Sequence, residues 1–340
     1  MPVIRQLIAD EFGTHIGKYS ERLKVTRGGE TLLQAPLLHL EMILVTSRGV
    51  SVSADAIEAC CERGIPVFFI DSQGTAYASL YSAGLTGTVL TRREQMAALN
   101  DQRGRDAALA FARGKIRNQA DTLKYLAKTR KETAPDLHQE LNLCAGEVLD
   151  HEIELDRLKG ETVDDIRAEL MGIEGRAAQK YWAAVKQVLP EEYKWPGRKR
   201  RGATDPINQM LNYGYGILYG QVERCIVLAG LDPYAGFTHV DRPGKPSLVL
   251  DLIEEFRQAA VDRVVFGLAN KRFTVRQDGD KLDQETRHRL AEHVLEHLET
   301  GVRYQGKRVP LRIVMQSQAR HLATFLRRDR ATYEPFQAGW

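Results

Sequence analysis

Apolar and polar residues alternate over short stretches in roughly the first ninety residues of the chain. The stretches VIRQLIA, RLKVT, MILVTS and PVFFID are rich in β-branched and aromatic residues, and turn-forming segments such as RGGE, SRGV and SQGT separate them. One interval has helical spacing instead, from Ser53 to Arg63, and it ends before Gly64. The pattern predicts a β-rich N-terminal region that contains one helix.

From residue 101 onward, apolar residues recur with the period of an α-helix, among good helix formers such as Ala, Leu, Lys and Glu. Thr162 and Asp165 have the spacing of an N-terminal capping box. Asp205 precedes a proline and predicts a helix that runs through Leu228. Pro246 predicts the start of another helix, with the sequence PSLVLDLIEEFRQAAVDRVVFGLA.

These patterns predict an α+β multidomain protein, and its 340 residues suit about two domains. We expect a small β-rich N-terminal domain over residues 1–92 and a linker over residues 93–100. A larger all-α domain over residues 101–340 follows and carries the candidate catalytic residues. The sequence shows no internal repeat with a period of 20–50 residues.

Composition restricts the possible functions. The formal net charge is only +3, so binding of nucleic acid would have to depend on local basic segments. The four cysteines include no C-x-x-C pair, which argues against a cysteine zinc site and against a disulfide framework. The opening residues lack the apolar core of a signal peptide, and no apolar run has transmembrane length. We therefore expect a reduced, cytoplasmic protein without membrane contacts.

The helix predicted after Pro246 carries acidic residues near one stripe of its surface: Asp251, Glu254, Glu255 and Asp262. Asp251 and Glu254 would lie about 60° apart around the helix axis. Its other positions are largely apolar, so the helix is expected to be buried and its carboxylates need partners. A metal ion would satisfy them, and so would salt bridges to Arg257 or Arg263.

Two further residues are candidate metal ligands. His239 lies in the loop GFTHVDRPGKPS directly ahead of the acidic helix, where an imidazole and two carboxylates could bind a divalent ion. Glu174 lies in RAELMGIEGRAAQKYW beside small residues that permit close approach of another element or of a substrate backbone. The alternatives are a surface histidine and an ordinary glutamate on the surface of a helix.

A basic loop suggests contact with nucleic acid. Its cations surround Trp195 and are Lys194, Arg198, Lys199, Arg200 and Arg201. This arrangement suits phosphate contacts together with stacking on a base or sugar, although a solvated charged face would have the same composition. A second basic region lies between Arg303 and Arg330.

The segment from His293 to His297 matches the H-x-x-E-H pattern of inverzincin metalloproteases. Its surroundings, DQETRHRLAEHVLEHLET, are polar around most of a helix and predict a solvent-facing amphipathic helix. Little chain follows that could supply a third ligand. We therefore give this motif little weight.

Three segments together resemble a known family. The strongest likeness lies between Asp205 and Phe266, where the chain reads DPINQMLNYGYGILYGQVERCIVLAGLDPYAGFTHVDRPGKPSLVLDLIEEFRQAAVDRVVF. The others are MGIEGRAAQKYW around Glu174 and the ending QARHLATFLRRDRATYEPFQAGW. They resemble the CRISPR-associated integrase that captures new spacers.

The resemblance implies an N-terminal β domain that helps to form a homodimer and a helical catalytic domain. Glu174, His239 and Glu254 take the positions of the ligands for Mg²⁺ or Mn²⁺, and Asp251 takes the accompanying acid position. The implied reaction joins the 3′-hydroxyl ends of a prespacer to a CRISPR repeat by transesterification. The implied partners are double-stranded DNA and a small ferredoxin-like acquisition protein.

Two alternatives remain open from the residues alone. One is a structure-specific, metal-dependent DNA repair endonuclease with the same ligands. The other is a non-catalytic DNA-binding scaffold whose acidic residues are satisfied by salt bridges. Metal-dependent turnover distinguishes the scaffold from both enzymes.

Overall fold

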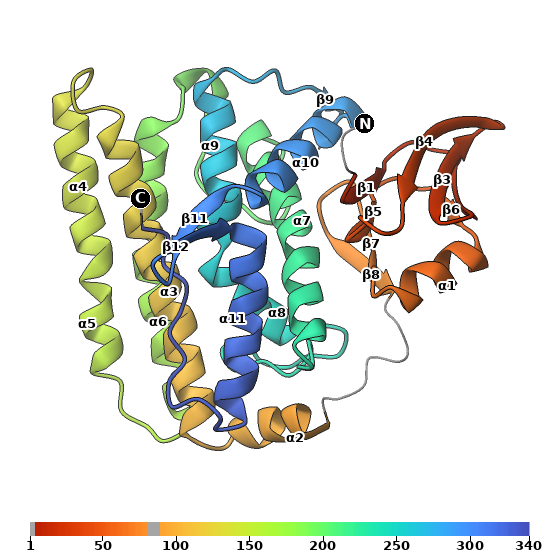
Figure 1. The fold of residues 1–340 in the computed structure, drawn as a ribbon. Coiled ribbons are helices and arrows are strands. Elements are labelled where there is room, and N and C mark those ends of the chain that lie inside the picture. The colour runs from red at the N-terminus through yellow and green to blue at the C-terminus, as the bar shows by residue number, and fades with distance from the viewer. Residues whose placement is uncertain (1–3, 81–88, 340) are drawn as a thin grey trace.

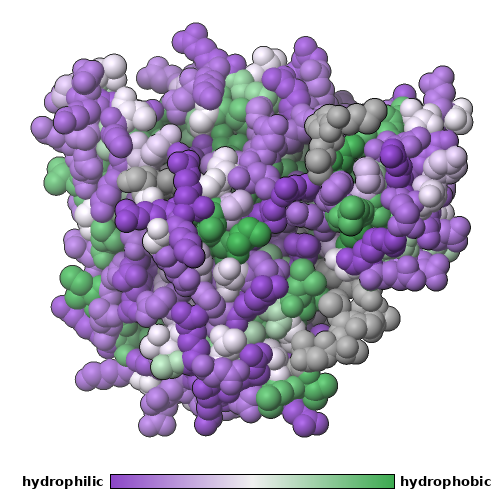
Figure 2. All heavy atoms as spheres, viewed as in Figure 1, coloured by the Kyte–Doolittle hydropathy of each residue, from purple (hydrophilic) through white to green (hydrophobic). Residues whose placement is uncertain are grey.

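The computed structural model describes residues 4–80 and 89–339. It consists of a small β-rich part followed by a larger, mainly helical part, as the sequence predicts (Figure 1). Among the described residues, no helix is both long enough and apolar enough to cross a membrane. The face of the molecule in Figure 2 is mainly hydrophilic, with scattered hydrophobic residues.

The described residues of the N-terminal part form two four-stranded sheets and one helix. The first sheet has the order β1 (Gln6–Ala9), β5 (Met42–Val45), β7 (Val67–Ile70) and β8 (Ala76–Leu80). The second has the order β4 (Glu30–Pro36), β3 (Arg22–Arg27), β2 (Thr14–Tyr19) and β6 (Ser51–Val52). The four predicted β-rich stretches form β1, β3, β5 and β7. The predicted helix is α1 (Ala54–Glu62), whose first turn is capped by the Ser53 hydroxyl.

The sheet that contains β5 lies between the second sheet and helix α7 (Pro206–Leu228) (Figure 1). Because successive side chains of a strand point to opposite faces, Ile43 and Val45 pack in the core of the β-rich part. Met42 and Leu44 join the core of the helical part instead, together with Phe68. Both faces of this sheet are therefore buried, which explains the nearly continuous apolar runs of β5 and β7.

The remaining part of the chain contains ten helices among the described residues, and they are α2 (Val89–Ala98), α3 (Gln102–Lys128), α4 (Pro135–Leu149), α5 (His151–Asp156), α6 (Val163–Val188), α7 (Pro206–Leu228), α8 (Ser247–Leu252), α9 (Arg263–Asn270), α10 (Gln284–Leu298) and α11 (Leu311–Leu326). Short helical turns cover Glu191–Tyr193, Ile253–Glu255 and Gln258–Asp262. The predicted capping box of α6 is present between Thr162 and Asp165. Asp205 caps α7, which ends at Leu228 as predicted.

Two β-hairpins interrupt the expected all-α character of this part. They are β9 (Gln277–Asp278) with β10 (Lys281–Leu282), and β11 (Gly301–Tyr304) with β12 (Lys307–Pro310). Gln305 and Gly306 both have positive φ between β11 and β12, which is the pattern of a tight type I′ hairpin turn. Residues 93–98, expected in a linker, belong to α2 instead. The division into domains at residue 92 stays a prediction.

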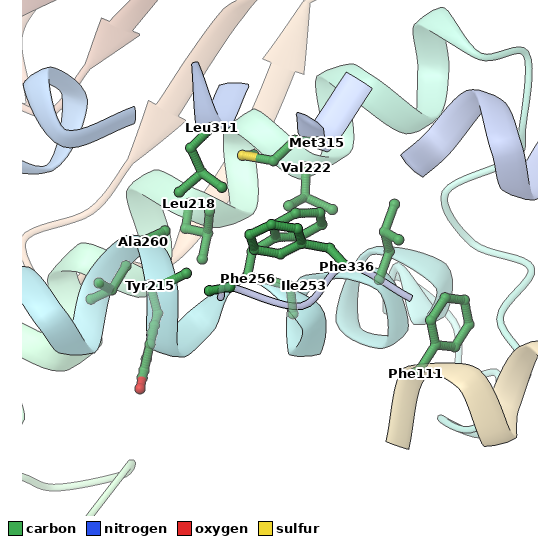
Figure 3. Close-up of a cluster of buried hydrophobic side chains, with 14 of the residues drawn as sticks. Phe111, Tyr215, Leu218, Val222, Ile253, Phe256, Ala260, Leu311, Met315 and Phe336 are labelled. Carbon is green, nitrogen blue, oxygen red and sulfur yellow. The ribbon is translucent and has the colours of Figure 1, made fainter. Parts of the chain in front are cut away.

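The segment after Pro246 does not form the single continuous helix that its period predicts. Helix α8 ends at Leu252, a 3₁₀ turn covers Ile253–Glu255, and a π-helical turn covers Gln258–Asp262 before α9 begins. Each change of helical type changes the rotation per residue, so the acidic residues leave their common stripe. Ile253 and Phe256 of this segment pack beside α7 and against Phe336 of the C-terminal tail (Figure 3).

The β-rich and helical parts meet where the turn between β7 and β8 reaches α7. Gly74 in this turn has a φ of +81°, and an added Cβ there would overlap the backbone of Asn212 and Tyr213. A Cβ at Gly216 of α7 would overlap the carbonyl group of Gly74. The two backbones can approach this closely only because both positions are glycine.

We expect Gly216→Ala to lower the free energy of unfolding by about 2 kcal/mol or more, because the methyl group must push the turn away from α7. Gly146→Ala is the matched control, since a Cβ at this exposed position of α4 meets nothing within 4 Å. It should raise the free energy of unfolding by up to about 1 kcal/mol through helix propensity. Urea unfolding of both variants tests the contact, and equal stabilities would contradict it.

Candidate active site

Helices α3 and α6 and the turn after α8 bring two glutamates and a lysine together. Glu174 lies on α6, and Glu254 lies on the 3₁₀ turn. The Nζ atom of Lys115 on α3 lies 3.0 Å from Oε2 of Glu254 and 3.8 Å from Oε1 of Glu174. Both glutamates are buried, with exposed fractions of 9% and 8%. The structure therefore brings together two of the predicted ligands, with a cation between them that sequence analysis missed.

The charges of this cluster are strongly coupled. Burial raises the pKa of Glu174, although Lys115 opposes the shift. Burial also acts to raise the pKa of Glu254, but Arg257 and Lys115 outweigh it and hold this pKa at about 2. Nε of Arg257 lies 2.9 Å from Oε1 of Glu254, so the salt bridge considered as an alternative is present. Glu254 is therefore ionised at neutral pH.

Asp251 fixes the loop that carries His239. It is 1% exposed, and its Oδ2 atom accepts hydrogen bonds from the backbone amides of Phe237 and Thr238. Its Oδ1 atom accepts a hydrogen bond from the backbone amide of His239 at 2.9 Å and lies 2.7 Å from Nδ1 of the His239 ring. With Nδ1 protonated for this contact, Nε2 keeps the lone pair that a ligand requires. Asp251 thus acts on His239 and positions it.

The donor set fits a hard divalent cation. Oε2 of Glu254 is buried, and the Lys115 ammonium is the partner that the described part of the chain gives it. His239 is close enough to Glu174 and Glu254 to act on the pKa of both. Carboxylate oxygens with one imidazole suit Mg²⁺ or Mn²⁺. Over residues 4–80 and 89–339, however, no three His, Cys, Asp or Glu side chains are already close enough to hold an ion.

Glu255 does not join the site, contrary to the common stripe expected from the sequence. It is fully buried and accepts hydrogen bonds from Tyr333 Oη at 2.5 Å, Gln318 Nε2 at 3.0 Å and the Phe336 amide at 2.9 Å. Asn118 of α3 donates to the carbonyl groups of both Glu255 and Phe336. The C-terminal tail is therefore bound to the turn that carries Glu254.

Asp262 also lies apart from the stripe. Its carboxylate accepts hydrogen bonds from the hydroxyl of Tyr181, at 2.8 Å, and from the hydroxyl of Tyr215. Arg257 lies over the ring of Tyr215 at 4.6 Å, and Arg198 lies over it at 5.4 Å. Burial raises the pKa of Asp262 to about 6, against the effect of the two hydroxyls. Asp262 therefore holds Tyr215, whose ring packs against Arg257. Arg257 in turn pairs with Glu254, so Asp262 supports Glu254 indirectly.

No element of the described chain packs closely against Gly175, because a Cβ there would meet nothing within 4 Å, so the expected close approach of another element is absent at this position. The stacking role of Trp195 is also wrong, because this side chain is 4% exposed and packs edge-on against Trp182. Neither the openness around Gly175 nor the burial of Trp195 could be read from local composition.

The basic loop divides into structural and accessible cations. Arg198 is half-buried and donates to the side chains of Asn208 and Asn212. Lys194 and Lys199 are exposed, and the backbone amide of Lys199 donates to Asn208. A cavity of about 780 Å³ lies between this loop, the β7–β8 turn and the turn of Ile253. Its cationic lining residues are Arg198, Arg200, Arg201, Arg242, Lys245, Arg257 and Lys281.

The H-x-x-E-H segment lies on α10, as the amphipathic pattern predicts. Nε2 of His297 lies 2.8 Å from the carbonyl oxygen of Ala259, and the ring of His293 packs against Phe273. His297 therefore serves the packing of α10 against the π-helical turn.

Comparisons with known proteins point to one family and one fold. The family model described as CRISPR associated protein Cas1 matches residues 7–296. A relative from Archaeoglobus fulgidus, named CRISPR-associated endonuclease Cas1, is 37% identical over 98% of this chain and all of its own length. A casposase bound to an integration product has the same fold, with a TM-score of 0.81 and 22% identity over 97% of this chain and 93% of that one. A chain of a Cas6-RT-Cas1–Cas2 complex has a TM-score of 0.78 and 19% identity, over 98% of this chain and 36% of its own.

We expect Asp262→Asn to change how stability depends on pH. The folded-state pKa of Asp262 is raised to about 6, so its protonated form favours folding at low pH and this contribution disappears as pH rises through 6. The difference in unfolding free energy, wild type minus variant, should fall by roughly 2 to 3 kcal/mol as the pH rises from 4 to 7. Urea unfolding with a chelator present measures this difference. Asp278→Asn, at an exposed position, is the control, and parallel pH profiles for wild type and Asp262→Asn would contradict the assignment.

Proposed function

Because the chain belongs to the family of CRISPR associated protein Cas1, a family of endonucleases, we propose that it is the DNA integrase of CRISPR spacer acquisition. In this reaction, a 3′-hydroxyl at the end of a prespacer attacks a phosphodiester of the repeat array and displaces another 3′-hydroxyl. With water as the nucleophile, the same site hydrolyses DNA. The observation that carries the proposal is the convergence of Glu174 and Glu254 beside an imidazole oriented by Asp251.

Glu174, Glu254 and Nε2 of His239 are the proposed ligands of Mg²⁺ or Mn²⁺. A divalent ion supplies charge stabilisation for the phosphoryl oxygens and for the leaving oxygen. Arg257 keeps Glu254 ionised and aims its carboxylate, and Asp251 holds the tautomer of His239. Two of the three proposed ligands are thus held by a second residue, which is how metal sites are usually oriented.

The cationic cavity is the proposed path of the DNA backbone. It adjoins the 3₁₀ turn of Glu254 through Ile253 and Arg257, and Asp280 is the acidic residue among its described lining residues. A concave surface of one sign of charge concentrates a polyanion and orients it. Arg200 and Arg201 are exposed in this wall, so both are available to phosphates.

The proposed partners are double-stranded DNA (the prespacer and the repeat array), a second copy of the chain and a small ferredoxin-like acquisition protein. The similar casposase is bound to an integration product, and another similar chain belongs to a complex with Cas2. The N-terminal β-rich part is the proposed contact between the two copies. A repair endonuclease with the same site would cleave branched DNA without joining ends at a repeat.

We expect Glu174→Ala, His239→Ala and Glu254→Ala each to reduce strand transfer by more than about a hundredfold, because even residues that only orient metal ligands are worth 10- to 100-fold. DNA binding and the fold should be retained. The assay joins a labelled duplex to a plasmid with a CRISPR repeat, with Mg²⁺, Mn²⁺ or EDTA and with the partner protein present.

His293→Ala is the matched control for His239→Ala, since it removes a half-exposed histidine outside the site and should leave joining intact. Near-native joining by any two of the three ligand variants would refute the ligand set. Metal-dependent cleavage without joining would favour the repair endonuclease, and no metal-dependent product would favour the scaffold.

We expect the double variant Arg200→Gln, Arg201→Gln to weaken DNA binding and to reduce the slope of log K against log salt by about 2, because each lost phosphate contact removes roughly 0.9. Lys199→Gln is the control, because Lys199 is exposed in the same loop but does not line the cavity. Fluorescence anisotropy at several salt concentrations measures both quantities. A double variant with the wild-type slope would remove these arginines from the DNA path.

A further inference from the structure

Lys115 occupies the space between the two proposed carboxylate ligands. Its Nζ atom lies 3.0 Å from Oε2 of Glu254 and 3.8 Å from Oε1 of Glu174. The side chains of all three residues are mostly buried, so the two carboxylates have little water between them to screen their repulsion. Without a cation in this place, two buried like charges would face each other.

Two cations cannot use these oxygens together. A divalent ion bound by Glu174 and Glu254 would lie between the same two carboxylates that the ammonium now bridges, and Oε1 of Glu254 is already engaged by Arg257. The ion and the ammonium would then be close neighbours in a poorly solvated site and would repel each other strongly. One of them must leave before the other binds.

Lys115 has the freedom to leave, whereas Arg257 does not. The guanidinium of Arg257 is fixed between the Glu254 carboxylate and the ring of Tyr215, at 2.9 and 4.6 Å. The ammonium of Lys115 lies on a flexible four-carbon chain, and its side chain keeps 18% of its surface exposed. Its backbone is held, because a Cβ at the preceding Gly114 would meet Glu255 at 3.1 Å and Pro335 at 2.8 Å. Only the side chain can withdraw.

We propose that Lys115 is a positioning residue that takes the place of the divalent ion in the metal-free protein and leaves the two carboxylates when the ion binds. The inference rests on the proposed function, in which Glu174 and Glu254 are metal ligands. In the metal-free state, the ammonium lies between the two carboxylates and holds them facing one another. When the ion binds, the contacts of Lys115 with the two carboxylates must break. This loss opposes metal binding and weakens the measured affinity for the ion.

The test is Mn²⁺ binding by the full chain, followed through the electron paramagnetic resonance signal of free Mn²⁺. Lys115→Met removes the charge and keeps the length of the side chain. It should bind Mn²⁺ at least tenfold more tightly than the wild type and unfold at a lower temperature in EDTA. Mn²⁺ should therefore raise its Tm by more than it raises the wild-type Tm.

Lys115→Arg keeps the charge and should keep an affinity no tighter than that of the wild type. Lys124→Met, which removes an exposed lysine of the same helix, should bind Mn²⁺ as the wild type does. If Lys115→Met does not fold, Lys115→Gln provides the same neutralisation with a polar group. A merely structural lysine would lower Tm in its variants without tightening Mn²⁺ binding.

Two failures can be told apart with Glu254→Ala. If the wild type binds Mn²⁺, Glu254→Ala does not, and neutral variants at position 115 bind no more tightly than the wild type, then the inference about Lys115 is wrong and the metal site stands. If neither the wild type nor the neutral variants bind Mn²⁺, the metal site is wrong and this inference fails with it.

Discussion

The structure depends on the burial of four carboxylates within one short segment. Asp251, Glu254, Glu255 and Asp262 have exposed fractions between 0% and 8%, and a buried charge without a partner would cost several kcal/mol. Each carboxylate therefore binds a different part of the molecule: the His239 loop, the cations of α3 and the turn, the C-terminal tail, or the tyrosines of α6 and α7. These partners hold the surrounding elements together.

The irregular backbone of this segment makes such a distribution possible. In one continuous helix, four acidic residues near one stripe would share a face and repel one another. With the 3₁₀ turn at Glu254 and the π-helical turn that ends at Asp262, the carboxylates reach different partners. Phe256 meanwhile stacks on Phe336 with ring centroids 5.4 Å apart, so that the same turn also contributes to the core (Figure 3).

The proposed function rests on two features that meet at that segment. The segment brings Glu254 beside Glu174, which with His239 are the proposed ligands of a divalent ion, and it contributes Ile253 and Arg257 to the cationic cavity. The β7–β8 turn forms a wall of this cavity because Gly74 and Gly216 allow it to touch α7. The small β-rich part therefore helps to shape the proposed DNA path in addition to its proposed role in pairing two copies.

The sequence alone determined the features that depend on neighbouring residues. Caps at Thr162 and Asp205, the ends of α1 and α7 and the main strands were predictable, because local hydrogen bonds and side-chain periodicity produce them. Spacing and local sequence suggested Glu174, His239 and Glu254 as candidate ligands among several alternatives, and the family resemblance singled them out as the ligand set. Only the tertiary structure decided the placement of Lys115 between Glu174 and Glu254, and the separate partners of Glu255 and Asp262. The physical reason is that a buried charge takes its partner from whichever segment packs against it, and those segments lie far apart along the chain.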